Sequence, residues 1–127
     1  MGRVVHPRMF DVADPVLARV RAIALDFPDA REVEAWGRPT FRAGTPMFAV
    51  YGVHDGRDTA LVFKPDPDER PALEHDARFY APPYHGAYGW LALDLTIDGD
   101  WDEVRELLDA SYRQVATKRR IAALDAR

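Results

Sequence analysis

Two apolar runs separated by a short turn constrain the fold of this 127-residue chain more than any other feature. Residues 47–51 and residues 59–63 are rich in the β-branched and aromatic side chains that strands favour. Asp55 and Gly56 lie between them and form a dipeptide typical of tight turns, because glycine accepts a left-handed backbone. The pattern predicts an antiparallel hairpin.

Helix and strand signals flank this hairpin. Asp14 and Pro15 are suited to the cap and first position of a helix that ends near Phe27, because the following proline disfavours helix there. Asp100 and Glu103 have the spacing of a capping box that opens a second long helix. Shorter elements are predicted at residues 32–36 (strand), 68–75 (helix), 89–95 (strand) and 117–125 (helix), with residues 79–84 extended.

The predicted order is α-β-β-β-α-β-α-α, an α+β fold with helices packed on an antiparallel sheet. We expect one domain over residues 1–127, because a chain of this length can bury one core but not two. We expect residues 1–10 to be flexible.

Composition excludes several kinds of site. The chain has no cysteine, which excludes disulfides, thiol nucleophiles and thiolate metal sites. The four histidines are scattered, so we predict neither a metal site nor a cofactor: His6, His54, His75 and His85. We expect a cytoplasmic protein without membrane association, because no apolar run could span a bilayer and residues 1–10 lack the apolar core of a secretory signal.

The charge is acidic but unevenly distributed. A net charge of −4 disfavours general binding to nucleic acids, whose phosphates dominate affinity. Residues 65–110 carry three arginines and twelve acidic side chains, whereas residues 111–127 carry five cations and one acid. Arg113, Lys118, Arg119 and Arg120 are therefore the candidate nucleic-acid-binding residues. The alternative is a solvated helical face, on which cations near a helix C-terminus are favoured.

Residues 36–44 form the first candidate ligand site. They read as a turn-forming segment between two strands, and loops held by strands commonly carry binding groups. Arg38 and Arg42 offer planar forks for phosphate or carboxylate, and the aromatic Trp36, Phe41 and Tyr51 lie near them in sequence. In the alternative interpretation, Arg38 pairs with an acid such as Glu34 and the aromatics belong to the core.

Residues 80–90 form the second candidate ligand site. Tyr84, His85, Tyr88 and Trp90 could line a pocket or stack on bases, or they could form a packed aromatic corner at a sheet edge. His85 is the one histidine considered for proton transfer, because imidazole titrates near neutral pH. No serine or aspartate beside it indicates a triad, so we assign no catalytic residue.

Four sequence blocks together resemble the MmcQ/YjbR family: residues 36–42, 47–49, 76–84 with 89–91, and 111–119. The resemblance implies a double-wing-like α+β fold, similar to frataxin-like and secretion-chaperone-like folds, and the DNA-binding label that such proteins commonly carry. The chain departs from the family at Pro46, where members often have lysine, and at Thr117, where they often have proline. The first departure removes a cation from the arginine-rich segment.

Three functions follow as hypotheses. The first is a non-enzymatic protein that binds DNA, as the resemblance implies. The second is a binding protein for an anionic or aromatic small molecule, held by Arg38, Arg42 and residues 84–90. The third is a chaperone-like dimer that binds a protein partner, which rests on fold analogy.

Overall fold

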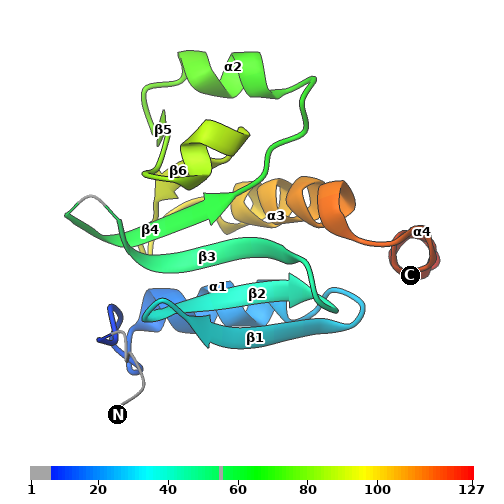
Figure 1. Cartoon of the computed structure of the whole chain (residues 1–127), viewed down its shortest axis with the longest axis horizontal. Coiled ribbons are helices and arrows are strands. Elements are labelled where there is room, and N and C mark those ends of the chain that lie inside the picture. Colours follow the sequence, from blue (N-terminus) through cyan, green and yellow to red (C-terminus); the bar gives the residue numbers. More distant parts are fainter. Residues whose placement is uncertain (1–6, 55) are drawn as a thin grey trace, which may run out of the picture.

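The computed structural model describes residues 7–54 and 56–127 (Figure 1). Four α-helices, six strands and one 3₁₀ turn are present in this part of the chain. In chain order they are α1 (Pro15–Ala24), β1 (Ala30–Ala35), β2 (Arg38–Ala43), β3 (Met47–His54), β4 (Arg57–Phe63), α2 (Arg70–His75), β5 (Phe79–Tyr80), η1 (His85–Tyr88), β6 (Leu91–Asp94), α3 (Trp101–Val115) and α4 (Lys118–Asp125).

The strands form one sheet in the order β1-β2-β3-β4-β6-β5, and every neighbouring pair is antiparallel. The α+β fold with an antiparallel sheet is therefore confirmed. The predicted hairpin is β3–β4, in which Tyr51 pairs with Leu61 and Ala49 with Phe63. Its turn contains Asp55, which lies outside the described residues.

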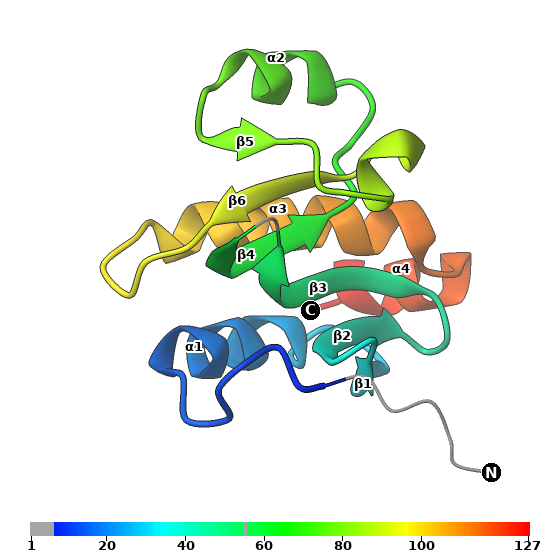
Figure 2. The ribbon, with the colours of Figure 1, turned by 60° about the vertical axis from the view of Figure 1, so that its left-hand side comes forward.

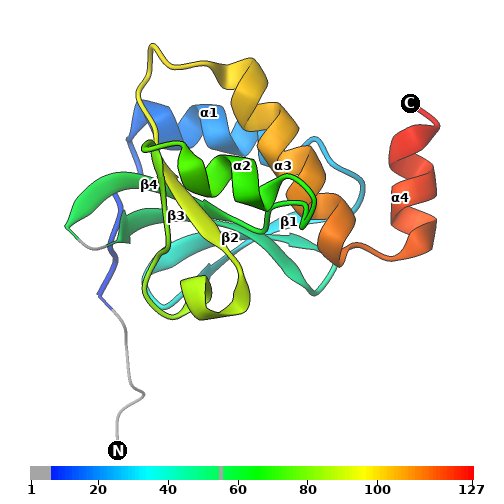
Figure 3. The same ribbon diagram turned by 90° about the horizontal axis from the view of Figure 1, so that it is seen from above.

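Helices α1 and α3 cover one face of the sheet, whereas α4 lies at one end, where its Leu124 packs against the core (Figures 1 and 3). Leu17 of α1, Phe48 of β3 and Leu108 of α3 are fully buried in the core that this arrangement creates. Tyr112 of α3 stacks on Phe27 at 5.0 Å between ring centroids and meets Phe48 edge-on at 5.4 Å. Such aromatic contacts add to the apolar burial that stabilises the core.

The opposite face carries a smaller apolar cluster. Val50, Val62 and Ala92 form a row across β3, β4 and β6 and are at most 1% exposed. Partly buried Met47, Tyr80 and Trp90 pack against them. The chain continues past β5 into η1 before it returns as β6, and α2 lies beyond β5 (Figure 2).

The prediction of a turn-forming segment at residues 36–44 was wrong, because most of it is strand β2. Proline is unusual inside a paired strand, since it cannot donate to a strand ladder. In the structure Pro39 is the second residue of β2 and faces Glu34 of β1, and the pairing with β3 begins only at Thr40. Thr40 is fully buried, and its hydroxyl donates to the Val33 carbonyl at 2.5 Å.

The predicted helix caps are confirmed. The Asp14 carboxylate accepts from the Val16 N–H at 2.8 Å at the start of α1. The Asp100 carboxylate accepts from the Glu103 N–H at 3.0 Å at the start of α3. Helix α1 ends at Ala24, earlier than predicted, and Phe27 packs into the core after the helix has ended.

The segment before α1 runs along the β1–β2 turn and the end of β3. The Met9 N–H donates to the Gly37 carbonyl at 2.7 Å, and the Met9 carbonyl accepts from the Val53 N–H at 3.2 Å. The flexibility expected of residues 1–10 falls, for residues 1–6, outside the described part of the chain. No helix in the described part is long and apolar enough for a membrane span.

Candidate functional site

The β1–β2 turn holds a tryptophan in an unusual backbone conformation. Only two residues, Trp36 and Gly37, connect the Ala35–Arg38 pair, and their φ angles are 54° and 78°. A two-residue hairpin turn with positive φ at both positions favours Asn-Gly, because a bulky side chain in the left-handed region costs about 1–3 kcal/mol. The turn places the Trp36 indole at its tip, where the side chain is 51% exposed.

Tyr84 has a second unusual backbone conformation. Its φ of 64° and ψ of −63° turn the chain into η1, and the residue is 89% exposed. Among the described residues, only three other than glycine have positive φ: Asp29, Trp36 and Tyr84. Two of these three line the same cavity.

That cavity, which we call the hairpin cavity, has a volume of about 520 Å³ and is lined by Met9, Trp36, Arg38, Val50, Tyr84 and His85. Its lining comes from the N-terminal segment, the β1–β2 turn, two central strands and the residues that enter η1. The volume falls within the range of small-molecule sites, and most of the lining is apolar or aromatic, as is usual for them.

Among the described residues, Arg38 is the one cation that lines the hairpin cavity. Its Nε donates to the Val53 carbonyl at 2.8 Å, which fixes the plane of the guanidinium. Among the described residues no carboxylate pairs with it, because Glu34 pairs with Arg8 at 3.1 Å instead. Burial lowers the pKa of Arg38 from its ordinary value, but an arginine side chain stays protonated. The site therefore contains a positioned positive charge without a counter-ion among these residues.

His85 lies next to this charge. Burial, and secondarily the positive charge of Arg38, lower the pKa of His85 from its ordinary value near 6.5. The imidazole is therefore mainly neutral at pH 7, with one nitrogen able to donate and the other able to accept a hydrogen bond. Its ring is 5.7 Å from that of Trp90, which packs against the Val50 cluster.

The structure thus brings together four of the eight predicted ligand-site residues: Trp36, Arg38, Tyr84 and His85. Trp90 does not line the cavity, but its ring contacts the ring of His85. Tyr51 lies on the opposite face of the sheet, fully buried, and its hydroxyl donates to the Asp14 carboxylate at 2.5 Å. Tyr88 is 80% exposed at the end of η1 and does not line the cavity.

Arg42 lies at the far end of β2, about 13 Å along the strand from Arg38 at about 3.3 Å per residue. Its Nη1 donates to the Thr45 carbonyl at 3.3 Å, and Arg31 Nε donates to the Gly44 carbonyl at 3.2 Å. The guanidinium of Arg120 packs on Gly44, where a Cβ atom would lie 2.5 Å from Arg120 Nη2. Arg42 is the direct cross-strand partner of Arg31, so it lies beside the turn that Arg120 of α4 contacts.

We call this cluster around the β2–β3 turn the basic end: Arg31, Arg42, Lys118, Arg119 and Arg120. Arg120 pairs with Asp29 at 3.0 Å. Arg113 was predicted to belong to the same surface, but it pairs with Asp109 at 2.6 Å and with Asp125 at 2.7 Å. Lys118 and Arg119 are exposed.

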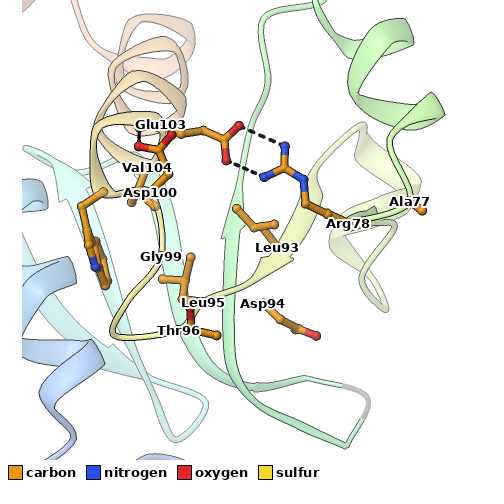
Figure 4. Close-up of a pocket in the computed structure, with 11 residues that line it drawn as sticks. Ala77, Arg78, Leu93, Asp94, Leu95, Thr96, Gly99, Asp100, Glu103 and Val104 are labelled. Atoms are coloured by element: carbon orange, nitrogen blue, oxygen red, sulfur yellow. Dashed lines mark hydrogen bonds and ion pairs between the residues drawn. The ribbon is translucent and has the colours of Figure 1, made fainter.

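A second cavity of about 400 Å³ lies between β6 and the start of α3 (Figure 4). Arg78 contributes its charge, but the guanidinium bonds to both Glu103 oxygens at 2.8 and 3.0 Å and to Asp76 at 2.8 Å. These bonds raise the pKa of Arg78 and leave its charge neutralised. In residues 7–54 and 56–127, no group of three or more ligating side chains could hold a metal ion.

Met9 and Val50 complete the hairpin cavity and were not predicted. Val50 alternates with Tyr51 along β3, so strand periodicity alone could have placed it on the face opposite Tyr51. Met9 had no sequence signal, because its position depends on backbone bonds to the turn and to β3.

The sequence model of one family, described as YjbR, matches residues 25–114. The matched range contains Trp36, Arg38, Tyr84 and His85 and ends before α4. No curated protein matches the chain.

Proposed function

The chain belongs to the YjbR family, and because a fold alone assigns no activity, we propose its function from the hairpin cavity: a non-enzymatic protein that binds a small ligand. The observation that carries this proposal is the placement of Trp36 and Tyr84, both at positive φ, beside the charge of Arg38, with which no carboxylate among the described residues pairs. Strained backbone of this kind clusters at ligand sites, where the surrounding structure over-determines it.

The lining favours binding over catalysis. None of the six lining residues is a serine, threonine, cysteine, lysine or carboxylate that His85 could activate as a nucleophile. Arg38 and the aromatic rings instead offer charge complementarity and flat apolar surface, which orient a ligand without reacting with it.

A thermal-shift screen of small aromatic anions tests this proposal. A ligand at a hundred times its dissociation constant raises the free energy of unfolding by about 2.7 kcal/mol. For a domain of this length that is roughly 10 °C in the midpoint, at about 4 °C per kcal/mol. The shift should disappear in Arg38→Met and persist in Arg42→Met, which removes an arginine from the same strand outside the cavity. No shift with any compound, or equal loss in both variants, contradicts the proposal.

DNA binding is a second candidate, and one structural feature favours it. Folding adds Arg31 and Arg42 to the cations of α4, so the basic end joins residues that are distant in sequence. The pairing of Arg120 with Asp29 and the net charge of −4 act against this candidate.

Fluorescence anisotropy with a DNA duplex at several salt concentrations tests this candidate. Each phosphate contact contributes about −0.9 to the slope of log affinity against log salt. The double variant Lys118→Ala with Arg119→Ala should reduce that slope by about two, whereas Arg70→Ala on α2 should leave it unchanged. Binding without salt dependence, or no binding at low salt, contradicts DNA binding.

Partner binding as a dimer stays a prediction, which light scattering at high concentration tests.

A further inference from the structure

The chemistry of the hairpin cavity narrows the class of ligand. Resting on the function proposed above, we propose that the ligand is a planar aromatic monocarboxylate. In this arrangement Arg38 binds the carboxylate of the ligand, and the side chains of Trp36 and Tyr84 pack on either side of the aromatic ring of the ligand.

The carboxylate follows from how Arg38 is held. Its Nε is occupied by the Val53 carbonyl, which leaves the edge formed by Nη1 and Nη2 as the donor pair. Two parallel N–H groups match the two oxygens of a carboxylate, and such a bidentate pair is stronger and more directional than a single contact. Because Arg38 is partly buried, solvent screens this pair less than it would on an open surface.

The single negative charge follows from the rest of the lining. Arg38 is the one cation among the six lining residues, and His85 is mainly neutral at pH 7. A phosphate monoester carries up to two charges and three acceptor oxygens, and proteins hold it with several donors. The four-residue turn η1 is too short to serve as a helical anion site. One cation therefore matches one carboxylate.

The planar ring follows from the positions of the aromatic side chains. Trp36 and Tyr84 come from separate segments, and large parts of both lie exposed in the free protein. A flat ring between these two side chains would cover aromatic surface that is otherwise in water, with Val50 and Met9 as apolar contacts. Aromatic faces favour flat partners, because offset stacking brings the ring quadrupoles into register.

Isothermal titration calorimetry with four matched probes tests the inference: 2-naphthoate, 2-naphthamide, 2-naphthyl phosphate and cyclohexanecarboxylate. The naphthoate should bind at least tenfold more tightly than each of the other three, because they remove the charge, add a second charge or remove the planarity. In Arg38→Met the preference for naphthoate over naphthamide should disappear, whereas Arg42→Met should keep it.

Trp36→Asn separates stacking from folding. Asparagine tolerates the left-handed backbone that this turn requires, so the β1–β2 hairpin is preserved while the indole is removed. Naphthoate affinity should fall at least fivefold while the circular dichroism spectrum is unchanged. An unchanged affinity in this variant, with the fold intact, overturns the stacking role of Trp36.

The remaining outcomes distinguish the inference from the function on which it rests. Equal binding of naphthamide and naphthoate, lost in Trp36→Asn, overturns the carboxylate and leaves the cavity as a ligand site. Tighter binding of naphthyl phosphate overturns the single charge, and equal binding of cyclohexanecarboxylate overturns the planar ring. No heat with any of the four probes overturns the inference, whereas the broader screen decides the proposed function.

Discussion

Replacement of Ser111 by alanine should destabilise the protein, because the Ser111 hydroxyl connects the residues at the ends of two neighbouring strands. Ser111 is fully buried, and its hydroxyl accepts from the Lys64 N–H at 2.9 Å and donates to the Phe48 carbonyl at 2.6 Å. The last β3–β4 pair in this direction is Ala49 with Phe63, so the hydroxyl connects the two residues that would pair next. It takes the place of a cross-strand hydrogen bond where the strands separate.

The magnitude follows from the two backbone groups that would lose their partner. Each buried polar group left unpaired costs about 1–3 kcal/mol. Alanine regains about 0.5 kcal/mol through its higher helix propensity. A water molecule needs about 30 Å³, more than one hydroxyl oxygen vacates, so solvent does not restore the bridge. Two such groups cost about 2–6 kcal/mol, so after the gain from alanine we expect Ser111→Ala to lower the free energy of unfolding by about 1.5–5.5 kcal/mol.

Urea denaturation followed by circular dichroism measures this change at an unchanged slope. A thermal scan should show a midpoint lower by about 6–22 °C, at roughly 4 °C per kcal/mol for 127 residues. Gln114→Ala is the matched control on the same helix, half-buried and without a side-chain hydrogen bond in the described structure, and should change stability by less than about 0.5 kcal/mol. A loss below 0.5 kcal/mol for Ser111→Ala would refute the reasoning, because the strands would then close the gap themselves.

Three further predictions concern other parts of the molecule. Tyr51→Phe should lower the free energy of unfolding by about 1–2 kcal/mol in urea, because the Asp14 carboxylate loses its buried donor; an unchanged midpoint contradicts this. Proton NMR should give His85 a pKa below 6.5 that rises in Arg38→Met, and stability should fall as pH drops below 6.5, because the unfolded chain then binds the extra proton; a pKa at or above 6.5 contradicts this. Gly37→Ala should reduce the midpoint in a thermal scan, because φ is 78° and the added Cβ would lie 2.0 Å from a backbone oxygen of the N-terminal segment; an equal or higher midpoint contradicts this.

Local signals were sufficient wherever the structure depends on neighbouring residues. The caps at Asp14 and Asp100 were predictable because a side-chain acceptor two or three residues before a free N–H satisfies it without any tertiary contact. The β3–β4 hairpin was predictable because its strands are adjacent in sequence and apolar throughout. Four side chains of the hairpin cavity were also predictable as candidates, because Trp36, Arg38, Tyr84 and His85 stand in segments rich in aromatic residues.

The grouping of side chains required the tertiary structure. Strand alternation sends Tyr51 into the helix-covered core and Val50 to the hairpin cavity, although they are neighbours in sequence. The length of β2 separates Arg38 from Arg42 and gives the second arginine to the basic end. Met9 reaches the cavity only through backbone bonds to a turn and a strand far along the chain.

The sequence by itself therefore determined the class of fold, the hairpin, the helix starts and the segments in which the candidate residues lie. Only the tertiary structure decided that β2 is a strand, because Pro39 is tolerated where the neighbouring ladder has not yet begun. It also decided which side chains share a cavity, because that depends on the register between strands and the length of each strand. Periodicity and capping act over a few residues, whereas register is set by the burial of a whole sheet face.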